Sequence, residues 1–193
     1  GITFRNTTTA IEAGQKGIAG SEGLTVKYSR FEDVGVGIHS DWVQPTYSSE
    51  TLARWFEKRG GAKVAGANGR AVLFATCSVN YSDAEVGRAT VEVLERSDVR
   101  VELHAERCCG MPYLDGGAID QCRALVRDNV RTLAAAVREG RDIVTPGPTC
   151  SYMLKQEYAW LDGSEDAKLV ASHTRDLFEY LAGLQAAGAL DTR

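Results

Sequence analysis

The sequence predicts an α/β domain in which a short parallel sheet lies between layers of helices. One observation is a continuous apolar run at 71–75, of the kind that a parallel sheet buries on both faces. The other is the order strand, helix, strand, helix, strand, helix, which is typical of βαβ units with right-handed crossovers. The 193 residues suffice for one sizeable core. We therefore expect a Rossmann-like, three-layer domain with an irregular N-terminal arm.

The first part of the chain, 1–66, is predicted to be an arm or linker. Glycine and threonine residues interrupt any sustained helical or strand period there. Within it, the stretch 47–56 predicts a short helix with Ser48 or Ser49 as its N-cap. Arg54, Lys58 and Arg59, together with Trp55 and Phe56, form a small amphipathic basic stretch. This stretch favours a solvated helix over the core edge rather than a helix that contacts a membrane or partner.

The core pattern begins with a first strand over 71–76, where the apolar run lies. Ser82 or Asp83 is expected to cap a helix in which apolar residues recur at helical spacing until Ser97–Asp98. Alternating apolar residues over 99–103 then predict the second strand. These elements form the first βαβ unit.

A long helix follows over 119–137, because its apolar residues are spaced three or four apart, and Gly140 ends it. The stretch 142–145 predicts the third strand. A further helix is expected over 150–157 after a Pro-Gly-Pro loop, and a last one over about 165–187. The chain thus repeats the βα alternation of a parallel sheet.

Composition excludes some classes of function. A formal net charge of −4 gives no electrostatic reason to bind nucleic acid or an anionic membrane. No stretch approaches the roughly 20 apolar residues that cross a bilayer, and the N-terminus lacks a signal-peptide layout, so we expect a cytoplasmic protein. Five cysteines, an odd number, favour thiols, metal ligands or catalysis over a disulfide framework.

Four of the cysteines follow predicted strands. Cys77 follows the first strand, Cys108 and Cys109 follow the second, and Cys150 follows the third. Carboxyl ends of parallel strands share one edge, so the four thiols should gather there. Four thiolates suit an iron–sulfur cluster or a structural zinc, although adjacent cysteines are unusual for zinc. Gly110 would let the backbone approach a bulky cluster.

The remaining candidates are predicted to be structural. Cys122 lies on the apolar face of the 119–137 helix, which favours core packing over a ligand role. The three histidines are His39, His104 and His173, and no serine–histidine–aspartate arrangement is evident among them. His104 is the one nearest to the cysteines that follow the second strand.

Three sequence blocks carry a resemblance to a known family. They are Phe-Ala-Thr-Cys-Ser-Val-Asn-Tyr at 74–81, Glu-Arg-Cys-Cys-Gly-Met-Pro at 106–112 and Gly-Pro-Thr-Cys at 147–150. Together they resemble the CCG cysteine-rich domain found in the C-type subunit of anaerobic glycerol-3-phosphate dehydrogenase and in heterodisulfide-reductase-like proteins. The resemblance covers about 45–190, and we expect the domain itself to occupy 67–193.

The resemblance implies a function and a site. Cys77, Cys108, Cys109 and Cys150, with Gly110 beside them, would bind an iron–sulfur cluster, expected to be [4Fe–4S], in an electron-transfer domain or oxidoreductase subunit. The implied partners are a flavin dehydrogenase subunit and other iron–sulfur domains. Such a complex would lie in the cytoplasm or peripherally at the inner face of the membrane.

The chain departs from the family pattern in two respects. Several relatives carry Cys-x-x-Cys in the third block, where this chain has Cys150-Ser-Tyr-Met153, so a fifth thiolate is absent. It also lacks the ferredoxin-type cysteine repeats and the second CCG copy of full-length relatives, so we expect a fragment or one piece of an assembly. Two alternatives stay open: a thiol- or disulfide-reducing enzyme subunit, and a cluster-free or zinc-binding interaction module.

Overall fold

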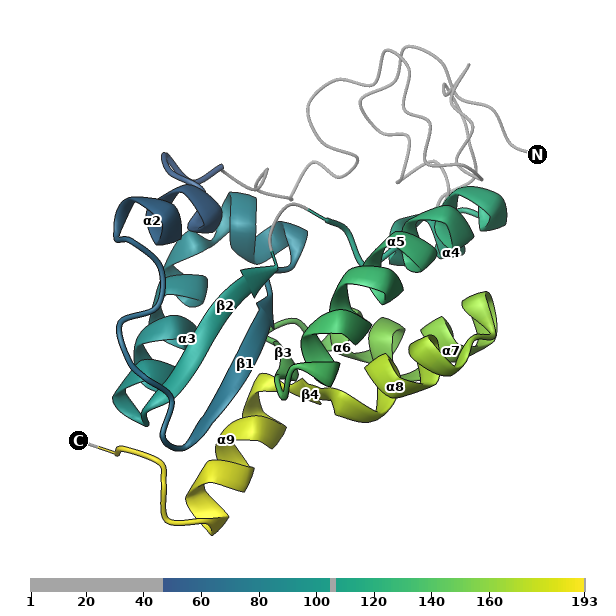
Figure 1. Cartoon of the computed structure of the whole chain (residues 1–193). Coiled ribbons are helices and arrows are strands. Elements are labelled where there is room, and N and C mark those ends of the chain that lie inside the picture. The colour runs from purple at the N-terminus through teal and green to yellow at the C-terminus, as the bar shows by residue number, and fades with distance from the viewer. Residues whose placement is uncertain (1–46, 105–106, 193) are drawn as a thin grey trace, which may run out of the picture. The chain divides into compact units, whose positions relative to one another are not determined.

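Within the described residues, 47–104 and 107–192, a four-stranded parallel sheet forms the middle layer (Figure 1). The structure is a computed structural model, and these residues belong to one compact unit, 47–193. The predicted arm up to residue 46, including His39, lies outside the described residues. The strand order is β2-β1-β3-β4, with β1 (Gly69–Phe74), β2 (Val99–His104), β3 (Asp142–Thr145) and β4 (Thr174–Asp176).

Helices cover both faces of the sheet, as the apolar run of β1 requires. Ala71 and Leu73 face one layer, Val72 and Phe74 face the other, and all four side chains are buried. The first layer contains α2 (Leu52–Lys58), α3 (Ala84–Arg96) and α9 (Leu177–Ala186). The second contains α5 (Ile119–Arg138), α6 (Pro148–Tyr152), η3 (Met153–Glu157), α7 (Tyr158–Asp162) and α8 (Glu165–His173). The predicted α/β, three-layer architecture is therefore confirmed.

Two short elements complete the loops after β1 and β2. A single π-helical turn, η2 (Ser78–Ser82), follows Cys77, and α4 (Met111–Asp115) follows Gly110. The helix predicted over 150–157 is longer than expected, because the helical stretch runs without a break from Pro148 to Asp162. Proline is favoured in the first turn of a helix, where its missing N–H is not needed.

The predicted N-cap of the first helix is wrong. Thr51 caps α2, and its hydroxyl accepts from the backbone N–H of Arg54 at 3.2 Å. The hydroxyl of Ser48 instead accepts from the N–H of Ala84 at 3.1 Å, at the start of α3. Asp83 stands at the N-cap position of α3, but its side chain makes no capping bond. A cap supplied from 36 residues away is a tertiary feature that local sequence does not encode.

The predicted last helix over 165–187 is also wrong, because β4 divides it into α8 and α9. Thr174 pairs with Ile143 of β3 and is fully buried. Asp176 then caps α9, and the Glu179 carboxylate accepts from the Asp176 N–H at 3.0 Å, which completes a capping box. Pairing with an open sheet edge overrides the helical period, and the Asp-x-x-Glu spacing was the local signal for a new helix start.

Helix α2 packs on the core rather than standing apart from it. Leu52 is fully buried, and Arg59 forms an ion pair with Glu95 while its guanidinium lies 4.9 Å from the Trp55 ring centroid. The predicted division of the chain at residue 66 stays a prediction. In 47–104 and 107–192, no helix is both long and apolar enough to span a membrane.

Candidate functional site

The candidate site lies where β1, β2 and β3 end. Cys77 follows β1, Cys108 and Cys109 follow β2, and Cys150 lies in the first turn of α6 after β3. The chain passes from β1 to β2 on one side and then to β3 on the other side of β1. This reversal is a topological switch point, the place where open α/β sheets bind ligands. The four cysteines therefore share the edge that the sequence predicted, and their role as ligands stays a prediction.

The loops after β1 and β3 touch each other. A Cβ atom added to Gly147 would lie only 2.8 Å from Cγ2 of Thr76, which is closer than real Cβ atoms approach carbon. Thr76 immediately precedes Cys77, and Gly147 begins the turn that carries Cys150. The absence of a side chain at Gly147 is thus what lets the two cysteine-bearing loops come together.

Exposure differs among the four thiols, all of which are free. Cys109 and Cys150 are only 3% and 7% exposed, Cys108 is half-buried, and Cys77 is exposed. The site therefore has a shielded side and an open side.

The two buried thiols form a hydrogen-bonded pair. A hydrogen bond from the Cys150 thiol lowers the pKa of Cys109 to about 7, and the Met111 backbone N–H contributes in the same direction. The same hydrogen bond, together with burial, raises the pKa of Cys150. Loss of a proton from this pair is therefore favoured at Cys109, while Cys150 keeps its proton.

Cys108 is coupled to the other thiols as well. Burial is the main cause that raises its pKa, and nearby charge on Cys109 and Cys77 raises it further. The Gly110 N–H donates to the Cys108 sulfur at 3.4 Å and acts in the opposite direction. Among the described residues, no group of three or more histidine, cysteine, aspartate or glutamate side chains is arranged to hold a metal ion.

Gly110 is required by its backbone and by its surroundings. Its φ is +101°, and an added Cβ would lie 3.3 Å from both the Cys122 sulfur and the Met153 methyl group. Cys122 is fully buried, as predicted, and donates to the Gly110 carbonyl at 3.5 Å. The side chain of Cys122 thus packs against the loop that carries Cys108 and Cys109 and bonds to it at Gly110. Its position on the apolar helix face did not indicate this contact.

Sequence reasoning missed two polar residues beneath this loop, Asn129 of α5 and Tyr158 of α7. Both are fully buried and bond to the backbone of Cys108 and Cys109. Burial raises the pKa of Tyr158 well above its ordinary value, so the phenol keeps its proton. Asn129 lies between the apolar residues of α5, and a polar residue on that face was the available signal. His104 lies 3.4 Å from Asn129, and burial lowers its pKa, which favours the neutral ring.

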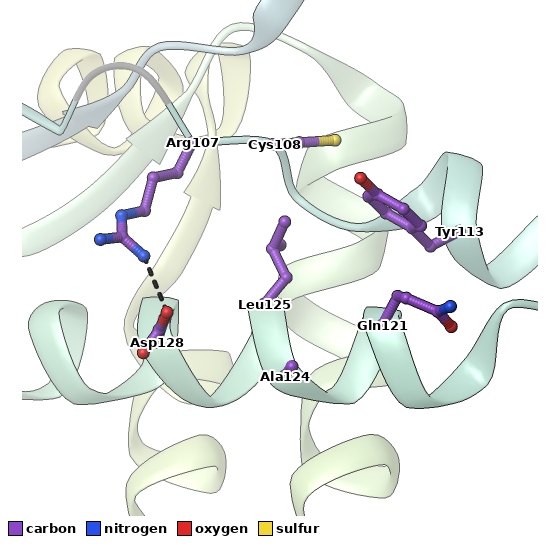
Figure 2. A pocket seen from close by; sticks show the side chains of 7 residues that line it. All are labelled: Arg107, Cys108, Tyr113, Gln121, Ala124, Leu125 and Asp128. Carbon is purple, nitrogen blue, oxygen red and sulfur yellow. Dashed lines mark hydrogen bonds and ion pairs between the residues drawn. The ribbon is translucent and has the colours of Figure 1, made fainter.

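An open pocket of about 780 Å³ lies beside Cys108 (Figure 2). Figure 2 shows Cys108 and Tyr113 above the side chains that α5 presents, and Arg107 donates to Asp128 at 3.1 Å at one end. The lining residues include Arg107, Cys108, Tyr113, Gln121, Leu125 and Asp128. The pocket gives the half-buried thiol of Cys108 direct access to the surface.

The opposite pKa shifts of Cys109 and Cys150 have a measurable consequence in the metal-free protein. One thiol should ionise with a midpoint near pH 7, because the Cys150 hydrogen bond lowers the pKa of Cys109 to about 7. In the Cys150→Ala variant, this pKa should rise toward its ordinary value of 9.0, so less thiolate is present at neutral pH. The ultraviolet absorbance of thiolate, followed across a pH titration, measures the ionisation midpoint of the wild-type protein and of the variant. A curve that Cys150→Ala leaves unchanged contradicts the pairing, and Cys122→Ala serves as the control.

The part of the chain that carries the cysteines is similar to a known family. The model of a family described as CCG, cysteine-rich domain, matches residues 71–155, which include all five cysteines. The C-type subunit of the anaerobic glycerol-3-phosphate dehydrogenase of Escherichia coli (strain K12) is 31% identical over 116 residues, or 59% of this chain and 29% of that protein. Lactate utilization protein A of Geobacillus kaustophilus (strain HTA426) is 34% identical over 115 residues, or 56% of this chain and 46% of that protein.

A second lactate utilization protein A, from Anoxybacillus flavithermus (strain DSM 21510 / WK1), is 35% identical over 115 residues, or 56% of this chain and 46% of that protein. The chain therefore spans less than half the length of these curated relatives. No solved structure matches the chain.

Proposed function

We propose that the segment matched by the CCG cysteine-rich domain model, residues 71–155, binds an iron–sulfur cluster and transfers electrons within an oxidoreductase complex. The observation that carries the proposal is the arrangement of Cys77, Cys108, Cys109 and Cys150. Three neighbouring parallel strands bring their thiols to one edge at a topological switch point.

The chemistry of this donor set fits a cluster. Thiolates are the protein ligands of iron–sulfur clusters, and four of them match the four irons of a [4Fe–4S] cluster. The ligands of a single ion must all contact one atom, whereas each ligand of a cluster binds a different iron and stays separated from the others by the cluster core. The four thiols influence one another's pKa values, yet no described group of side chains is arranged to hold a single metal ion. Thiols that lie near one another without meeting at one point agree with a cluster.

The surrounding groups suit negative charge on sulfur. The backbone N–H groups of Gly110 and Met111 donate to the sulfurs of Cys108 and Cys109, respectively. Such donors stabilise thiolates and set how readily a site accepts an electron. A bound cluster would supply reversible one-electron transfer. Cys109 and Cys150 shield one side from water, and Cys77 and the pocket beside Cys108 leave the other side open for exchange with a partner.

The names of the relatives support a place in a complex. One is a subunit of an anaerobic glycerol-3-phosphate dehydrogenase, and others are lactate utilization proteins. We propose that this chain works beside a flavin-containing dehydrogenase subunit and other iron–sulfur domains. The complex would be cytoplasmic or held peripherally at the inner face of the membrane through its partners.

A second candidate function is reduction of disulfides by the chain's own thiols. The hydrogen-bonded pair of Cys109 and Cys150, with a pKa of about 7 at Cys109, favours it. In that reaction the two thiols become a disulfide while the substrate disulfide takes up two electrons and two protons. The burial of both sulfurs opposes it, because a disulfide substrate must reach the attacking thiolate.

Anaerobic reconstitution distinguishes these functions. Wild-type protein incubated with iron and sulfide and then desalted should retain one cluster, with about four irons and about four sulfides per chain. Visible absorbance and electron paramagnetic resonance of the reduced sample measure it. Absence of a cluster from wild-type protein contradicts the proposal. Zinc retained in its place supports an interaction module, and disulfide turnover by the metal-free protein supports the second candidate.

A further inference from the structure

A buried polar network lies beneath the two adjacent cysteines. The Asn129 amide nitrogen donates to the carbonyl of Cys108 at 2.9 Å and to the hydroxyl oxygen of Tyr158 at 2.8 Å. The Tyr158 hydroxyl donates in turn to the carbonyl of Cys109 at 3.0 Å. The Asn129 carbonyl oxygen lies 3.4 Å from Nε2 of His104, which can donate to it. The network therefore holds both peptide carbonyls of the cysteine pair.

Every polar atom of Asn129 and Tyr158 has a partner inside the protein, and both side chains are fully buried. Burying an amide or a hydroxyl is costly unless its hydrogen bonds are made. A fully bonded network of this kind specifies one arrangement, because any rotation leaves a donor or acceptor unpaired in the interior. Apolar residues of similar size would pack the same space without that constraint.

The network joins parts of the chain that are far apart in sequence. Asn129 lies 21 residues from Cys108, and Tyr158 lies 49 residues from Cys109. The segment 107–109 has no regular secondary structure of its own. The backbone hydrogen bonds of a strand or helix therefore do not hold these peptides. The direction in which each thiol points depends instead on contacts from α5 and α7.

We propose that Asn129, Tyr158 and His104 are positioning residues that orient the Cys108–Cys109 peptides and so fix how the two thiols are presented. His104 contributes indirectly, by fixing the orientation of the Asn129 amide, and its ring stacks on Phe74 at 5.4 Å between centroids. The inference rests on the proposed function for what the thiols bind. The orientation itself exists in the metal-free chain and is tested there.

The Tyr158→Phe variant keeps the ring and removes the hydroxyl that bonds to Cys109. In the metal-free protein, we expect Cys109 to react with iodoacetamide about tenfold faster, because the freed peptide opens the 3%-exposed thiol to reagent. Peptide mass spectrometry measures alkylation of each cysteine in the same sample. Exposed Cys77 is the internal reference, and its rate should not change.

Tyr180→Phe is the matched control, since Tyr180 packs in the layer on the opposite face of the sheet. It should leave the ratio of Cys109 to Cys77 alkylation at the wild-type value. A loss of thermal stability in Tyr158→Phe with an unchanged ratio overturns the inference, because a merely structural tyrosine gives that result. The Asn129→Asp variant, which keeps the shape and removes the amide donors, provides an independent test with Cys108 as the reporter and a similar acceleration expected.

Reconstituted protein gives a second readout. In Tyr158→Phe, iron release to a chelator should be about tenfold faster, and the paramagnetic signal should broaden, because the thiols adopt more than one orientation. If the iron release rate and the paramagnetic signal of Tyr158→Phe equal those of the wild type, the inference is overturned for the cluster-bound protein. If wild-type protein binds no cluster while Tyr158→Phe still accelerates Cys109 alkylation, the positioning role holds and the proposed function fails.

Discussion

Replacing Cys109 by alanine is expected to abolish cluster binding. Cys109 is 3% exposed, and a hydrogen bond from the Cys150 thiol lowers its pKa to about 7, which favours the thiolate that a cluster would need. An alanine there would remove the thiolate that would hold one iron, at a position where 3% exposure leaves little room for water or an outside thiol to replace it. Iron and sulfide per chain after anaerobic reconstitution should fall to the level of protein that received no sulfide. Cys77→Ala should lose less, because its exposed position admits a replacement ligand from solvent.

The matched control for this experiment is Cys122→Ala. Cys122 is equally buried and lies beside the same loop, yet it is predicted to pack rather than to bind. The variant should lose about 1–2 kcal/mol of unfolding free energy and keep its iron. Loss of the cluster from Cys122→Ala, or its retention in Cys109→Ala, would show that the proposed ligand set is wrong.

Gly147→Ala is expected to destabilise the protein by about 1–3 kcal/mol and to reduce cluster retention, because overpacking forces its neighbours to move. The new methyl group would lie 2.8 Å from Cγ2 of Thr76, so the Thr76 side chain or the loops that carry Cys77 and Cys150 must shift. Denaturant unfolding measures the first effect, and iron per chain measures the second.

Two further variants isolate the cause. Gly183→Ala makes the same substitution inside α9, where an added Cβ meets nothing within 4 Å, so it should stabilise the protein by up to about 1 kcal/mol. Thr76→Ser removes the colliding methyl group and retains the hydroxyl that accepts from the Val79 N–H. Combined with Gly147→Ala, it should restore most of the stability and iron. An unrescued double variant contradicts the collision as the cause.

The secondary structure of the core could be predicted because its signals are local. The strand predicted at 71–76, the alternation at 99–103 and the helical period at 119–137 correspond to β1, β2 and α5 within two residues. β4 could not be predicted, because it has only three residues and forms by pairing with β3, which is distant in sequence. The cap that Ser48 provides for α3 was missed for the same reason.

The sequence alone determined that four cysteines follow three parallel strands, and parallel strands place their carboxyl ends at one edge whatever the details of packing. It also determined the CCG resemblance, which the family model bears out. Only the tertiary structure decided which thiols are shielded, that a hydrogen bond from Cys150 lowers the pKa of Cys109, and that Asn129 and Tyr158 hold the peptides of the cysteine pair. Burial and hydrogen bonding depend on residues brought together from distant parts of the chain, and no local period in the sequence records them.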